Sequence, residues 1–198
     1  MAGVVPEVRT IAVIGAGPLG RGIAQLAACG GYRTILEDLL PNALRRAESE
    51  IRIQFDRATE AGRISLSAAH AALSRLEFAG SVEDASRPAD LVIEAVPEEL
   101  ESKIEIFTLL DKICRPGTIL ASHLSSLSIT GLNINALSIT EISRVTYRAQ
   151  NCLGMCFAQP IDSATKLEII RGQETDDATL AIVAEVGRRM GKEVVVIK

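Results

Sequence analysis

Short apolar segments alternate along this chain with longer segments in which apolar residues recur at helical spacing. The short segments, which we expect to be strands, lie at residues 11–14, 32–38, 91–94, 118–122, 151–157, 166–170 and 193–197. Helical spacing is found after Gly20 and at residues 41–59, 99–113 and 176–190. Strands that alternate with helices predict an α/β fold, doubly wound around a mostly parallel sheet.

A helical hairpin interrupts this alternation. The helical segment from Pro41 to about Thr59 is followed by a second one that ends near Arg75, so we expect a hairpin over residues 41–76. The chain has 198 residues, of which 47% are hydrophobic, enough for one substantial core. No linker or low-complexity segment divides it, and we expect a single domain over residues 1–198.

The first expected strand runs directly into a G-x-G-x-x-G turn, Gly15-Ala-Gly17-Pro18-Leu19-Gly20, and then into a helix. In a dinucleotide-binding turn the first glycine permits the tight turn, the second lets a pyrophosphate approach the backbone, and the third lets helix and strand pack closely. The N-terminus of the helix then faces the phosphates. The plainer alternative is a glycine turn that begins an ordinary helix.

An acidic residue at the end of the second strand favours the dinucleotide interpretation. Asp38 stands about 20 residues after the glycine turn, where a carboxylate binds the hydroxyls of the adenosine ribose. Leu39 follows it instead of an arginine, and a carboxylate repels a 2′-phosphate. The sequence therefore predicts a Rossmann-type domain that binds NAD in preference to NADP.

Charge and cysteine content exclude several classes of function. The formal charge of −4 provides no basic field, so we expect no nucleic-acid or membrane partner. The first seven residues lack the features of a signal peptide, and no apolar run is long enough to span a membrane, which predicts a cytoplasmic protein. The four cysteines, Cys29, Cys114, Cys152 and Cys156, form no C-x-x-C pair, so we expect reduced thiols and no metal site.

From Ile11 to Lys198 the chain resembles the L-3-hydroxyacyl-CoA dehydrogenases. The motifs that carry the resemblance are the glycine turn, Asp38, residues 89–98 with Lys103, residues 125–129 and residues 166–172. The resemblance implies an N-terminal NAD-binding domain and hydride transfer between NAD and a 3-hydroxyacyl-CoA. It also implies that Glu98 and Lys103 lie along the cofactor and that Ser125 touches cofactor and substrate. Alternatively, Glu98 and Lys103 are a solvated pair at a helix start, and Ser125 is an N-cap.

The catalytic motif departs from the family pattern. Where the family has an acid/base histidine, with a glutamate twelve residues later to orient it, this chain has Cys156 and Glu168. Gln159 replaces the asparagine expected near the nicotinamide. An imidazole has a pKa near 6.5 and a thiol one near 8.5, which a neighbouring carboxylate raises further. Because losing a positioned acid/base costs about a hundred- to ten-thousandfold in rate, we expect impaired turnover. Alternatively, Cys156 is a small core residue, or a nucleophilic or redox thiol.

Two histidines and five basic side chains remain to be weighed as candidates for binding or catalysis. His123 ends an expected strand, where a cofactor-side contact or, less readily, acid/base chemistry is open to it, whereas His70 lies within a helix of the hairpin. Arg52, Arg57 and Arg63 are available on the hairpin to bind coenzyme A, or are simply solvated. Lys166 and Arg171 are likewise either candidates for binding coenzyme A or solvated side chains.

Two differences from the family concern the cleft. Residues 127–130 recur almost unchanged at 137–140, so we expect an extra segment over about 131–140 beside the site. The family continues into a helical C-terminal domain that this chain lacks, which makes a homodimer or another covering subunit an expected partner. Besides the dehydrogenase, two functions stay open: a non-catalytic NAD(H)-binding or structural module, and a dehydrogenase of a free hydroxy acid such as gulonate dehydrogenase.

Overall fold

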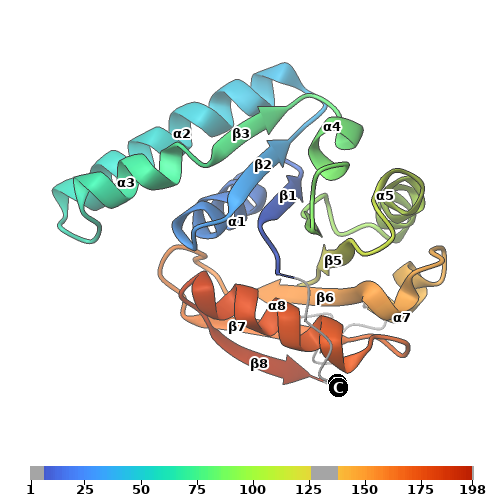
Figure 1. Ribbon diagram of the computed structural model, residues 1–198. Helices are drawn as coiled ribbons and strands as arrows, with labels where there is room; N and C mark the ends of the chain where they lie inside the picture. Colours follow the sequence, from blue (N-terminus) through green and yellow to red (C-terminus); the bar gives the residue numbers. More distant parts are fainter. Residues whose placement is uncertain (1–6, 126–137, 198) are drawn as a thin grey trace.

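The chain forms one eight-stranded sheet in the order β3-β2-β1-β4-β5-β6-β7-β8 (Figure 1). The computed structural model describes residues 7–125 and 138–197. The strands are β1 (Thr10–Ile14), β2 (Arg33–Glu37), β3 (Leu76–Ala79), β4 (Leu91–Glu94), β5 (Ile119–His123), β6 (Cys152–Phe157), β7 (Lys166–Arg171) and β8 (Glu193–Ile197). Neighbouring strands are parallel except β6 and β7, which pair antiparallel. The expected doubly wound, mostly parallel sheet is confirmed.

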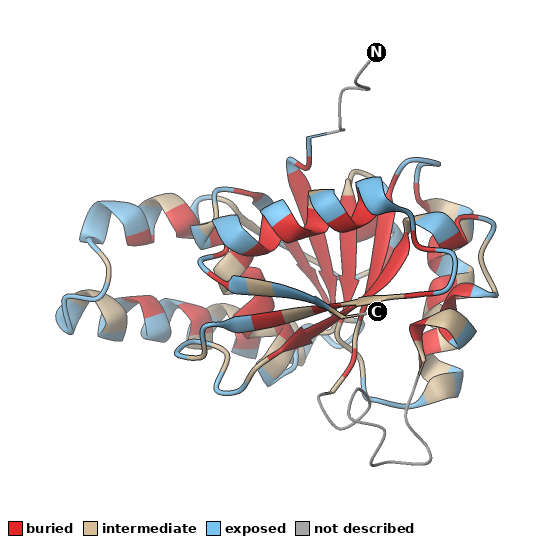
Figure 2. Cartoon of the chain, turned by 90° about the horizontal axis from the view of Figure 1, so that it is seen from below, coloured by how far each residue is buried: buried red, intermediate tan, exposed pale blue. Residues whose placement is uncertain are grey.

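Helices cover both faces of this sheet. The helices α1 (Pro18–Cys29), α2 (Pro41–Glu60), α3 (Leu66–Leu73) and α8 (Asp177–Arg189) contribute to one apolar core. The helices α4 (Val82–Ser86), α5 (Leu100–Ile113) and α7 (Ile139–Ser143) pack around a second core on the opposite face. A 3₁₀ turn, Ala149–Asn151, leads into β6. Figure 2 shows the buried strands lying between these two helical layers.

The central strands owe their position to apolar side chains on both faces. Every residue of β1 and of β4 is buried, as expected for strands with helices on either side. The edge strand β8 is different, because Val195 and Val196 are 43% and 44% exposed. The sheet therefore ends in an apolar edge that the described residues leave partly uncovered.

The helical hairpin is present where the sequence places it. Ala47, Ile51 and Phe55 lie one helical turn apart on α2 and are buried, while the rest of its surface is mostly solvent-exposed. Ser65 begins α3 as an N-cap, since its hydroxyl accepts a hydrogen bond from the N–H of Ala68 at 3.2 Å. Both figures show α2 and α3 extending beyond the end of the sheet.

Some elements differ from expectation. The hairpin ends at Leu73, and residues 76–79 form β3, which the sequence pattern did not indicate. The short helix α4 was not expected either. Of the predicted extra segment, residues 131–137 lie outside the described part of the chain, as do residues 127–130; the remainder, 138–140, begins α7, where Ser138 is the N-cap. Among the described residues no helix is long and apolar enough to cross a membrane.

Candidate active site

The glycine turn joins β1 to α1 in a conformation that only glycine adopts readily. Gly15 has φ +101°, in the left-handed region. A Cβ on Gly20 would lie 1.8 Å from the carbonyl oxygen of Gly15, so the third glycine is required by contact with the turn itself rather than with the strand. A Cβ on Gly17 would meet nothing within 4 Å. The turn therefore leaves no room for a side chain at Gly20, whereas the space beside Gly17 is free of protein atoms.

The start of α1 fits an anionic group. Pro18 is its first residue, and Gly17 is an N-cap with no side chain to occupy the free backbone N–H groups. These donors and the open space at Gly17 are what a pyrophosphate requires. Leu19, the next residue of the helix, borders the groove described below.

Asp38 lies directly beside this turn. One carboxylate oxygen accepts a hydrogen bond from the N–H of Ala16 at 3.0 Å, and the other accepts one from Leu40 at 2.9 Å. Leu39 is 70% exposed, so no positive side chain stands between Asp38 and solvent at that position. The structure therefore brings Asp38 and the glycine turn together, as an adenosine site requires.

The sequence prediction missed the neighbouring Glu37. Its side chain is 2% exposed, and its Oε1 atom has no hydrogen-bond partner. Burial, and then the charge of Asp38, raise the pKa of Glu37 to about 7. The available signal was an acidic residue at the last position of an otherwise apolar strand.

A buried ion pair supports the ends of β4 and β5. The Lys103 ammonium donates to both carboxylate oxygens of Glu94 at 2.8 Å and to the backbone oxygen of His123 at 2.9 Å. Ser122 donates to the same carboxylate at 2.6 Å, and the N–H of Val96 does so at 2.7 Å. Lys103 is fully enclosed, which contradicts the alternative in which Glu98 and Lys103 form a solvated pair. Its ammonium contacts Glu94 and the backbone of His123.

Glu98 and Ser125 meet across the loops that follow β4 and β5. The N–H of Ser125 donates to Glu98 Oε1 at 3.0 Å. The two residues were expected at one cofactor site, and this contact holds them side by side at the same edge of the sheet. A role for Ser125 as an N-cap concerns the residues after 125, which lie outside the described part of the chain.

The expected catalytic residues line a pocket of about 440 Å³ at the ends of β5, β6 and β7. Its lining residues are His123, Ser125, Cys156, Phe157, Ala158, Gln159, Lys166 and Glu168. Cys156 and Glu168 are directly paired in the antiparallel register of β6 and β7. The thiol is 4% exposed; burial, and then the facing carboxylate, raise the pKa of Cys156 to about 11. Cys156 is therefore a neutral thiol near pH 7.

His123 lines the same pocket as Cys156. Burial, and then the nearby Lys103 ammonium, lower the pKa of His123 to about 4, so the imidazole is neutral at physiological pH. Its Nδ1 atom is buried without a hydrogen-bond partner, and its ring lies 6.4 Å from that of Phe157. The other histidine, His70, is exposed on α3, away from this pocket.

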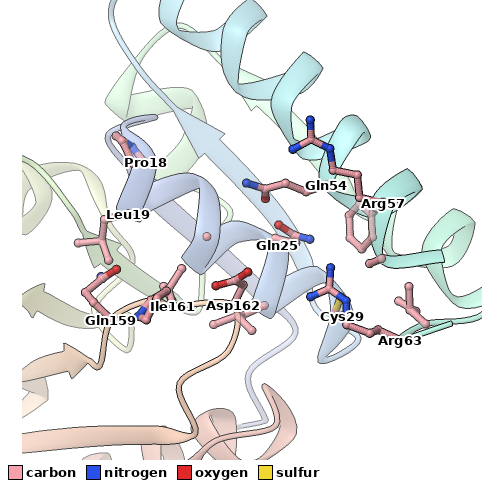
Figure 3. Close-up of a pocket in the computed structure, with 16 residues that line it drawn as sticks. Pro18, Leu19, Gln25, Cys29, Gln54, Arg57, Arg63, Gln159, Ile161 and Asp162 are labelled. Carbon is pink, nitrogen blue, oxygen red and sulfur yellow. The ribbon is translucent and has the colours of Figure 1, made fainter. Parts of the chain in front are cut away.

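A larger groove of about 850 Å³ adjoins this pocket. Gln25 and Cys29 on α1, Gln54 and Arg57 on α2, Arg63 and Asp162 surround it (Figure 3). Gln159 lines both cavities, so the groove and the pocket adjoin at this residue. Arg52 does not line the groove, since it pairs with Glu48 at 2.9 Å on the outer side of α2. Arg171 pairs with Asp177 at 2.6 Å and lines neither cavity.

Lys166 is the functional candidate that the sequence left unassigned. Its ammonium pairs with Glu168, two residues further along β7, and its side chain is 53% exposed. Strand alternation places residues 166 and 168 on one face, a signal that was readable in the sequence. The four cysteines are free, as expected, and the described residues contain no group of three or more potential metal ligands.

Comparison with known proteins agrees with this geometry. The family model for the 3-hydroxyacyl-CoA dehydrogenase NAD-binding domain matches residues 10–198. A probable 3-hydroxybutyryl-CoA dehydrogenase of Bacillus subtilis is 37% identical over 96% of this chain, which covers 62% of that relative. A 5-formyl-3-hydroxy-2-methylpyridine 4-carboxylate 5-dehydrogenase of Mesorhizobium japonicum is 30% identical over 96% of this chain and 58% of the relative.

A solved structure shares the fold closely. The (S)-3-hydroxybutyryl-CoA dehydrogenase of Ralstonia eutropha superimposes with a TM-score of 0.88 at 31% identity, covering 97% of this chain and 64% of the other. The chain thus spans a little over three fifths of the length of these two 3-hydroxybutyryl-CoA dehydrogenases. It belongs to the 3-hydroxyacyl-CoA dehydrogenase family and carries that family's NAD-binding domain.

Proposed function

We propose that this chain is the NAD-binding part of an oxidoreductase that transfers hydride between NAD and a 3-hydroxyacyl-CoA. The observation that carries the proposal is that the groove and the pocket lie next to each other, with Gln159 in the lining of both. A thioester substrate needs a long site with cationic groups at one end and the reacting carbon at the other. Arg57 and Arg63 border the groove, and Cys156, Lys166 and Glu168 line the pocket.

Different residues of the chain bind different parts of NAD and of coenzyme A. Asp38 holds the adenosine ribose, the N–H groups at the start of α1 hold the pyrophosphate, and Glu98, Ser125 and Gln159 lie along the remaining path to the pocket. NAD supplies the hydride acceptor when it is bound. The guanidinium groups of Arg57 and Arg63 bind phosphates of coenzyme A.

Turnover is slow in this proposal, because the position of the family histidine holds a neutral thiol. The same observation favours a second function, that of a non-catalytic NAD(H)-binding module. A third function is oxidation of a free hydroxy acid. The named substrate of the Mesorhizobium relative, a formyl pyridine carboxylate, likewise has no coenzyme A. In all three, a second copy or another subunit covers the apolar edge at β8.

The decisive experiment mixes the protein, at near-stoichiometric amounts, with NADH and acetoacetyl-CoA and follows NADH absorbance. NADH binding is measured separately by fluorescence. Oxidation of NADH above a protein-free control supports the dehydrogenase, whereas binding without oxidation supports the module. Oxidation with free acetoacetate but not with its thioester supports the third function. Failure to bind NADH rejects all three.

Matched arginine variants test the groove. Arg57→Ala and Arg63→Ala each raise the KM for acetoacetyl-CoA, by about tenfold, because each removes a charge-assisted contact. Arg52→Ala, outside the groove, leaves it unchanged. Equal effects of all three would reject the groove as the coenzyme A site. Cys156→His, which restores an imidazole opposite Glu168, raises the rate if only the base was lost.

A further inference from the structure

The pocket around Cys156 contains one positively charged side chain among its described lining residues, that of Lys166. Lys166 is the first residue of β7, and its ammonium is held by the carboxylate of Glu168 on the same face of the strand. Leu167, between them, points into the core and anchors the strand. Ammonium and carboxylate therefore face the pocket together from a fixed stretch of backbone.

The other polar groups of the pocket carry no positive charge. Cys156 is a neutral thiol, 4% exposed, and the imidazole of His123 is neutral as well. Ser125 and Gln159 have uncharged polar side chains. Glu168 accepts in its pair with Lys166. Among the described lining residues, Lys166 is therefore the one cationic proton donor for a ketone oxygen on which negative charge develops.

We propose that the Lys166 ammonium donates the proton to the C3 oxygen of a 3-ketoacyl substrate, and that Glu168 is the positioning residue that holds it. The inference rests on the proposed function, in which NADH is the reductant. As C3 accepts the hydride, the π electron pair of the carbonyl moves onto oxygen. That oxygen forms an O–H bond while an N–H bond of Lys166 breaks. The resulting neutral amine regains a proton from solvent, which reaches its half-exposed side chain.

The ammonium contributes in two ways. Its charge stabilises the oxygen while negative charge develops there, and its proton completes the alcohol. The reverse reaction needs the neutral amine. An imidazole donor would lose its proton near pH 6.5, so a reduction rate that stays level from about pH 6 to about pH 8 excludes an imidazole donor.

Three variants test the assignment through acetoacetyl-CoA reduction. Lys166→Met lowers kcat at least a hundredfold, the usual loss for a positioned acid, while the Kd for NADH is unchanged. Lys166→Arg keeps the charge and the pair with Glu168 but loses activity as well, since a guanidinium does not release its proton. Lys112→Met, an exposed position at the end of α5 outside the pocket, behaves as the unaltered protein.

A second measurement is independent of turnover. Acetic anhydride labels exposed lysines, and mass spectrometry follows Lys166 and Lys112 with and without saturating acetoacetyl-CoA. We expect labelling of Lys166 to slow severalfold and labelling of Lys112 to stay constant. A Lys166→Met variant that keeps kcat within threefold, or labelling of Lys166 that acetoacetyl-CoA does not slow, overturns the assignment. Absence of NADH binding rejects the proposed function instead, and the labelling result then decides on Lys166 alone.

Discussion

The carboxylate of Asp38 accepts a hydrogen bond from the backbone N–H of Ala16 at 3.0 Å. This contact ties the end of β2 to the middle of the glycine turn. The carboxylate is held from its other side by the N–H of Leu40. Its orientation is therefore set before a ribose arrives, so that little ordering of the side chain opposes binding.

Substitutions at Asp38 and Leu39 should change the cofactor preference from NADH to NADPH. In the variant Asp38→Ser with Leu39→Arg, the ribose hydroxyls lose their acceptor and a 2′-phosphate gains a cationic partner at an exposed position. We expect the Kd for NADH to rise and that for NADPH to fall, each by about tenfold, as measured by fluorescence. Asp38→Ser with Leu40→Arg adds the same charge one residue later and serves as the control. A retained preference for NADH would contradict the assignment of Asp38.

The substitution Gly17→Ala should weaken NADH binding while leaving the stability of the fold nearly unchanged. Its Cβ meets no protein atom, and an N-cap change of this kind costs only about 1 kcal/mol or less. The added methyl nevertheless occupies the space that a pyrophosphate needs. We expect nearly unchanged stability and a Kd for NADH at least tenfold higher. Unchanged NADH affinity would show that no phosphate approaches this backbone.

The substitution Gly20→Ala, by contrast, should lower the stability of the fold. Its Cβ would lie 1.8 Å from the Gly15 carbonyl, which belongs to the backbone and cannot swing aside. Overpacking of this kind costs about 1–3 kcal/mol or more. Urea unfolding should show that loss, in contrast to Gly17→Ala.

The Cys156 thiol should be unusually unreactive. With its pKa raised to about 11, only about one thiol in a thousand is ionised at pH 8, and the thiolate is the species that alkylates. We expect iodoacetamide to label Cys156 slowly at pH 8 and faster towards pH 11. Glu168→Gln removes a charge that raises this pKa and should accelerate labelling at pH 8; Glu185→Gln, on α8, should not. Labelling as fast as that of free cysteine would show that the thiol is not suppressed.

Glu37 makes the folded state sensitive to pH. Its pKa is about 7 when folded and about 4.3 when unfolded, so it stabilises the protein below the unfolded value and loses that contribution as pH rises through 7. Relative to Glu37→Gln, the unaltered protein should lose about 1–3 kcal/mol of unfolding free energy between pH 5 and pH 8. Urea titrations at both pH values measure this.

A surface glutamate provides the control. Glu77→Gln removes a carboxylate that pairs with Arg33 on the neighbouring strand, and the pair lowers the pKa of Glu77. That carboxylate stays ionised from pH 5 to pH 8, so this variant should keep the pH slope of the unaltered protein. An equal slope in Glu37→Gln would mean that Glu37 is hydrated.

Long periodic segments and apolar runs were predictable from the sequence, and short segments of mixed polarity were not. The expected helix at 99–113 is observed at Leu100–Ile113, and the expected strand at 91–94, a mostly apolar run, has those bounds. By contrast β3 and α4 mix apolar and polar residues over only four and five positions, too few for a period to be recognised.

The residues of the candidate site also differ in how far the sequence predicted them. The glycine turn and Asp38 follow from spacing alone, because strand and helix lengths determine where they meet. The buried ion pair of Lys103 could not be predicted from spacing. Its partner Glu94 is a buried strand residue, and the pairing depends on how α5 packs against the sheet. The pairing of Lys166 with Glu168 was readable, because the sequence predicted a strand over residues 166–170 and alternation places both residues on one face.

The antiparallel pairing of β6 and β7 also has an evolutionary consequence. Residue 156 faces residue 168 because of backbone hydrogen bonds, which do not depend on the side chain at either position. A single codon change at 156 or 166 can therefore alter which atom carries the proton while the surrounding backbone stays as it is. In such a hairpin, acid/base chemistry can be lost, moved to a neighbouring residue and regained without a new fold.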